Sequence, residues 1–92
     1  MAFGPLSVGA YLLGVDQYLD AAAPEKRGPF IEQQIRVIGS HNRALEAWAH
    51  HGRGNPPSPF NAFELASITL ELSKRLANVR DEASIQTQIA AE

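Results

Sequence analysis

Two clusters of proline and glycine, 24–29 and 52–59, divide this chain of 92 residues into three segments. Within each segment the apolar residues recur every three or four positions, which places them along one stripe of an α-helix. No run alternates apolar and polar residues over enough positions to suggest a paired strand. The sequence therefore predicts an all-α fold in which a short N-terminal helix packs on a longer helical hairpin, with helices over about 6–23, 30–51 and 62–90.

Prolines and glycines also predict the ends of the first two helices. Pro5 suits the entry of the first helix, and Pro24 is placed to stop it. Pro29 fits the first turn of the second helix, and Gly52 fits its end. Both clusters are interpreted as turns, because neither is long enough to link two domains.

The third helix has the clearest start signal. Asn61 and Glu64 have the spacing of a capping box, in which each side chain accepts a hydrogen bond from the backbone N–H of the other. Phe60 and Leu65 stand where a hydrophobic staple would place them. These four residues predict that the helix begins directly after Asn61.

The first helix has an apolar stripe with two tyrosines beside it. The stripe consists of Val8, Leu12, Val15, Leu19 and Ala22. Tyr11 and Tyr18 flank it, whereas Asp16 and Asp20 lie on the other side of the helix. We therefore expect the stripe to face the hairpin and the two carboxylates to face away from it.

The second helix carries an amide within its apolar stripe, which consists of Ile31, Ile35, Ile38, Asn42, Leu45 and Ala49. A buried Asn42 must find a partner or cost about 1–3 kcal/mol, and in coiled coils one such Asn sets the register and the oligomer number. Alternatively, the helix is rotated, or it bends at Gly39-Ser40, and Asn42 reaches water. Trp48 continues a neighbouring row, formed by Phe30, Val37 and Ala44, so this helix is apolar over a wide arc.

The third helix changes its apolar face near its end. Its stripe consists of Leu65, Thr69, Leu72, Leu76, Val79 and Ala83, and Glu71 forms a favourable i,i+4 pair with Arg75 on the outside. Ile85 and Ile89 lie about 100° away from that stripe. Either the helix kinks between 80 and 84, or its last turns meet another surface, such as that of a second subunit.

Composition argues against several classes of function. The length fits one domain, residues 1–92. Eight Lys and Arg are scattered among ten Asp and Glu, with a net charge of −2, so no basic face for nucleic acid or an anionic membrane is predicted. The chain has no cysteine, which fits a cytoplasmic protein. A signal peptide is disfavoured, because the apolar start lacks a basic region.

No pattern predicts a metal, a cofactor or catalysis. Glu46 and His50 share one helical face, and so do Asp16 and Asp20, but the Glu-x-x-His pairs of dimetal bundles do not occur. Ser40 and His41 are sequence neighbours, which is no evidence for a catalytic triad. We therefore predict a protein that is not an enzyme.

The loop after the second helix suggests an alternative function. His50, His51 and Arg53 stand beside two glycines, a composition that can bind an anion such as a phosphate or a nucleotide. The end of a helix carries negative dipole charge, however, and basic residues there can simply complement it. The loop also matches no phosphate-binding fingerprint.

The wide apolar arc, the amide in the seam and the displaced isoleucines predict a small helical module that mediates protein–protein interaction or structural assembly. Its partner would be a second copy, another helical protein, or both. The residues predicted to contact it are Tyr11, Tyr18, Asn42, Trp48, Ile85 and Ile89. Compact helical chains of this kind are frequent among phage virion and host-interaction proteins and among bacterial adaptors, so virion association is the alternative to a cytoplasmic location; this is an analogy of architecture.

Overall fold

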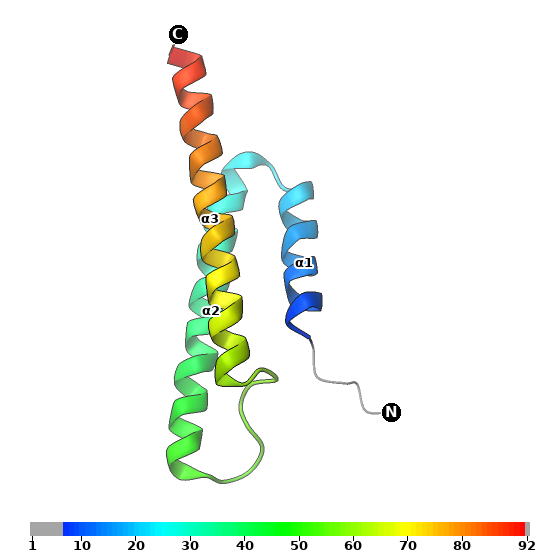
Figure 1. Cartoon of the computed structure of the whole chain (residues 1–92), viewed down its shortest axis with the longest axis vertical. Helices are drawn as coiled ribbons and strands as arrows, with labels where there is room; N and C mark the ends of the chain where they lie inside the picture. The colour runs from blue at the N-terminus through cyan, green and yellow to red at the C-terminus, as the bar shows by residue number, and fades with distance from the viewer. Residues whose placement is uncertain (1–6, 92) are drawn as a thin grey trace.

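A computed structural model describes residues 7–91, and within that range the chain forms three helices and no strand. They are α1 (Val8–Ala21), α2 (Pro24–His51) and α3 (Ala62–Ala91). Helices α2 and α3 run antiparallel along one another, and α1 lies beside them (Figure 1). The predicted all-α fold is confirmed. The expected entry at Pro5 and Leu6 lies outside the described residues.

The second helix begins earlier than the sequence suggested, so the predicted turn over 24–29 was wrong. The linker is only Ala22 and Ala23, both extended, and Pro24 occupies the first helical position, where a missing N–H costs nothing. Pro29 lies inside the helix. Tertiary contacts stabilise this first part of α2, because Arg27 Nε donates to the Leu19 carbonyl at 2.9 Å.

The helix ends that depend on local chemistry were predicted correctly. Gly52 ends α2 in the left-handed conformation with φ 62°, which favours glycine. Asn61 Oδ1 accepts from the Glu64 N–H at 2.8 Å, and Glu64 Oε1 accepts from the Asn61 N–H at 3.0 Å. The N-cap of α1 is Ser7, which the sequence analysis missed; its Oγ accepts from the Ala10 N–H at 3.0 Å.

The core is a layer of aliphatic side chains between α2 and α3, closed by one residue from α1 and one from the loop. The buried set is Val15, Ile31, Ile38, Phe60, Leu65, Ile68 and Leu72. The predicted stripes supply most of it, but Ala49 and Ala83 at their ends are exposed. Phe60 and Leu65 of the predicted staple are both buried.

Helix α3 is continuous from Ala62 to Ala91, with no break between 80 and 84. Figure 1 shows that its last turns extend beyond the start of α2, with no other helix beside them. Ile85 and Ile89, which belong to the last turns of α3, are 55% and 66% exposed. Contact of these two residues with a partner stays a prediction.

Replacing Asn61 with alanine removes half of the capping box. We expect Asn61→Ala to lower the free energy of unfolding by about 1 kcal/mol, as measured by urea denaturation. Asn78→Ala is the matched control, since Asn78 is exposed in the middle of α3, and alanine is the better helix former there. An equal decrease in the free energy of unfolding in the two variants would contradict the capping role of Asn61.

Candidate interaction surface

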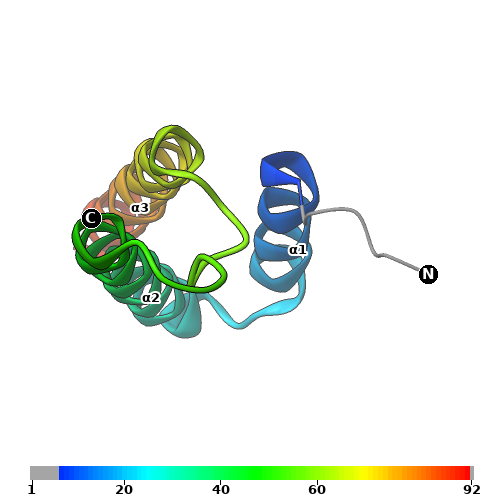
Figure 2. The same cartoon turned by 90° about the horizontal axis from the view of Figure 1, so that it is seen from below.

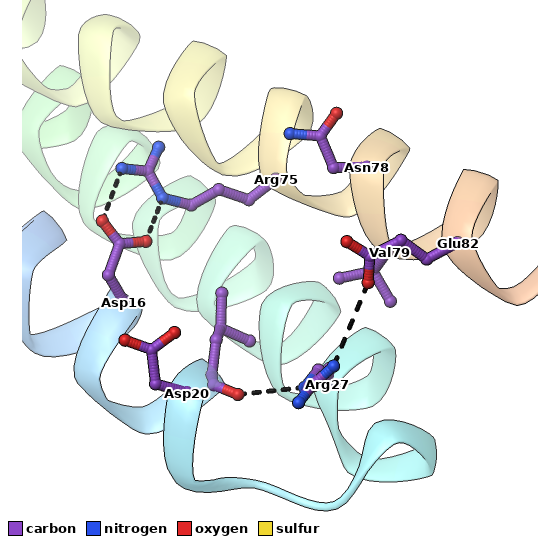
Figure 3. Close-up of a pocket in the computed structure, with 8 residues that line it drawn as sticks. Asp16, Asp20, Arg27, Arg75, Asn78, Val79 and Glu82 are labelled. Carbon is purple, nitrogen blue, oxygen red and sulfur yellow. Dashed lines mark hydrogen bonds and ion pairs between the residues drawn. The ribbon is translucent and has the colours of Figure 1, made fainter.

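An ion pair joins α1 to the hairpin. Arg75 donates from Nε and Nη2 to the two carboxylate oxygens of Asp16 at 2.7 and 3.0 Å (Figure 3). Its Nη1 donates to Glu71 Oε1 at 3.2 Å, as the i,i+4 spacing predicted. Asp16 therefore faces the hairpin instead of pointing away from it. The hydrogen bond from Arg75 holds the pKa of Asp16 below its usual value and raises the pKa of Arg75.

A second arginine, which belongs to α2, contacts both α1 and α3 at this junction. Arg27, in the first turns of α2, bonds the Leu19 carbonyl of α1 and lies 4.0 Å from Glu82 of α3. Figure 3 shows both arginines around a pocket of about 340 Å³, lined also by Asp20 and Asn78. The guanidinium groups are engaged by the carboxylates and the carbonyl that surround them. We therefore assign this pocket to the attachment of α1.

The two tyrosines predicted for a partner contact face the hairpin. Tyr11 lies edge-on to Phe60, with ring centroids 6.0 Å apart, and its hydroxyl donates to Gln34 Oε1. Burial raises the pKa of this hydroxyl. Tyr18 stacks on Phe30 at a centroid distance of 3.8 Å, yet 43% of it stays exposed. Both rings hold α1 in place, and a partner role for them stays a prediction.

Trp48 fastens the loop between α2 and α3. Its indole Nε1 donates to the carbonyls of Arg53 and Gly54 at 3.1 and 3.3 Å. The ring also lines an open groove of about 560 Å³ between the loop, with Pro56 and Pro59, and the start of α3. The structure thus gives Trp48 an intramolecular partner that lies in the neighbouring loop.

The basic residues of the same loop point to solvent. His50 and His51 form the last turn of α2, and Arg53 follows the cap; all three are exposed. Within the described part of the chain, no group of three His, Asp or Glu side chains lies close enough to hold a metal ion. Anion binding at this loop stays a prediction.

The sequence left open whether Asn42 is buried in the apolar seam or reaches water, and the structure shows an intermediate position. Asn42 is half-buried, α2 is helical through Gly39-Ser40, and the amide lines an open groove of about 520 Å³ between α2 and α3. Across the groove lie residues of α3, namely Leu65, Ala66, Thr69, Leu70 and Ser73. Asn42 is therefore placed at the rim of the core, next to the outer side of α3.

The outer side of α3 is the surface that sequence reasoning missed. Phe63 is 79% exposed and Leu70 is 56% exposed, on the side of α3 opposite the buried Ile68 and Leu72. Their spacing of seven residues was a usable signal. It was overlooked because one stripe along the same helix already accounted for the core.

The three helices of the described part contain no stretch long and apolar enough to cross a membrane. No protein-family model, curated protein or solved structure matches the chain.

The Asp16–Arg75 pair can be tested by removing one charge. Since Asp16 is half-exposed, we expect Asp16→Asn to lower the free energy of unfolding at neutral pH by about 1 kcal/mol at most. Asp20→Asn is the matched control, because Asp20 forms no ion pair within the described part of the chain. Chemical denaturation measures the free energy of unfolding of both variants. An equal decrease in the two would contradict a specific role for Asp16.

The same pair predicts a pH dependence. The folded pKa of Asp16 lies below its ordinary value of 3.8, so its contribution is fully present above that value and is lost as the pH falls through the folded pKa. We expect the stability of the wild type to fall more steeply below pH 3.8 than that of Asp16→Asn. Thermal unfolding across the acid range measures this, and parallel curves would argue against it.

Proposed function

We propose that this protein is a non-enzymatic helical module that mediates protein–protein association, with a second copy of itself as the main partner. The observation that carries the proposal is that α3 is apolar on two sides. One side supplies Leu65, Ile68 and Leu72 to the core, and the other presents Phe63 and Leu70 to solvent. A helix on the surface of a small domain normally has a polar outer side.

The energetic case rests on the size of the exposed groups. Covering a fully exposed side chain of the size of Leu or Phe contributes about 1.5–3 kcal/mol. Phe63, Leu70, Ile85 and Ile89 all lie on α3 with more than half of their surface exposed. Phe63 and Leu70 lie two turns apart on one side of α3, and apolar side chains exposed side by side typically mark an interaction site.

Charge supports a second copy as the partner. The net charge of −2 gives little repulsion between identical chains. The five ion pairs of the described residues also combine acidic and basic side chains locally, so no large field of one sign is formed by them. Virion components and bacterial adaptors are settings in which such a module would work, by analogy of architecture.

Self-association predicts a mass that depends on concentration. We expect light scattering coupled to size-exclusion chromatography to show the average mass rising above that of one chain over about a hundredfold increase in concentration, as for an interface of modest size. Circular dichroism at the two limits should be the same, because the fold of each chain does not change. The mass of a single chain throughout would contradict self-association.

A further inference from the structure

We propose that two copies associate through an antiparallel pair of α3 helices, related by a two-fold axis that passes beside Leu70. This inference rests on the proposed self-association and specifies the surface and its geometry. The surface is a stripe of five exposed residues, called here the outer stripe, consisting of Phe63, Ala66, Leu70, Ser73 and Ala77.

The spacing of the outer stripe is that of a helix–helix seam. Its residues alternate steps of three and four, the pattern that keeps a stripe facing one neighbouring helix. From Phe63 to Ala77 it is about 21 Å long. Arg75, which contacts α1, lies about 140° around α3 from Leu70, so α1 does not block the stripe.

The outer stripe is complementary to itself in size when one copy is reversed. About an axis at Leu70, Phe63 of one copy faces Ala77 of the second copy, and Ala66 lies about 1.5 Å along the axis from Ser73 of the second copy. The bulkiest residue thus meets a small one at each end, and two small residues let the backbones approach beside the central leucines. In a parallel pair, Phe63 would meet Phe63 and the alanines would face each other across a gap. Identical patches on both copies are what a two-fold interface requires.

The hydroxyl groups of the stripe and its edges can leave water at low cost. Ser73 Oγ donates to the Thr69 carbonyl at 2.9 Å, and Ser67 Oγ donates to the Phe63 carbonyl at 3.1 Å. Thr69 Oγ1 donates to the Leu65 carbonyl at 2.9 Å. Burying a polar group is expensive mainly when it loses its hydrogen bond, and these three keep theirs.

The charges beside the stripe are compatible with the antiparallel pair. Lys74 lies next to the stripe and forms an ion pair with Glu71 of its own helix at 3.1 Å. In the proposed register the two Lys74 side chains are about 12 Å apart along the axis, whereas each lies about 7.5 Å from Glu71 of the second copy. Opposite charges are therefore closer across the interface than the two lysines are.

The groove at Asn42 borders this surface. Ala66, Leu70 and Ser73 line the groove and also belong to the outer stripe. A second helix on the stripe would cover the mouth of the groove and bring Asn42 to the edge of the interface. A patch about 21 Å long and about 10 Å wide covers about 200 Å² on each copy, less than the roughly 800 Å² per partner of a typical specific interface, so we expect weak and transient association.

Introduced thiols test the register directly, because the chain has no cysteine of its own. We expect Leu70→Cys to form a disulfide-linked dimer under mild oxidation, since its two copies meet at the axis. Ile85→Cys is the matched control on the same helix, with its two copies about 45 Å apart in the antiparallel pair. Cross-linking of both variants would indicate a parallel pair and would overturn the proposal.

Charge substitutions separate this inference from self-association itself. We expect Leu70→Lys to abolish the rise in mass with concentration, and Leu13→Lys, at a leucine of similar exposure on α1, to leave it unchanged. Both residues are exposed, and unchanged circular dichroism would show that the fold is retained. If the wild type associates and Leu70→Lys associates equally well, the outer stripe is not the interface, but the proposed self-association is retained. A wild type that is monomeric at every concentration would overturn both.

Discussion

The aliphatic contact between α2 and α3 is the interaction on which the rest of the structure depends. Ile31 and Ile38 pack against Leu65, Ile68 and Leu72, all at 1% exposure or less. The chain has no disulfide to support this contact. Among the described residues of α1, Val15 alone is buried, so the hairpin provides the platform on which α1 is placed.

Helix α1 is attached by aromatic and polar contacts more than by a buried aliphatic core. Stacked and edge-on aromatic rings, the Asp16–Arg75 pair and the bond from Arg27 to a helix-end carbonyl hold it against the hairpin. Figure 2 shows α1 standing to one side of the hairpin formed by α2 and α3. Such half-exposed contacts are weaker than a buried core and are sensitive to pH.

Because α1 covers one side of the hairpin, the other side of α3 has no neighbour within the described chain. The outer stripe and the groove at Asn42 lie there, and their polar groups already have partners or stand at the rim. The proposed association extends the same helix packing that forms the core. In this association, a second copy supplies the neighbouring helix that the outer side of α3 lacks within the described chain.

The sequence by itself determined the three helices, the capping box at Asn61 and the glycine end at Gly52, because periodicity and capping depend on residues only a few positions apart. It also located most of the core stripes, but it missed the buried Ile68 and included Ala49 and Ala83, which are exposed. Only the tertiary structure decided that Asp16 meets Arg75, which is 59 residues away, and that α2 begins at Pro24 instead of after the second proline. It likewise decided that Phe63 and Leu70 stay exposed. One helix can carry two apolar stripes, and which of them is buried depends on where the other helices lie.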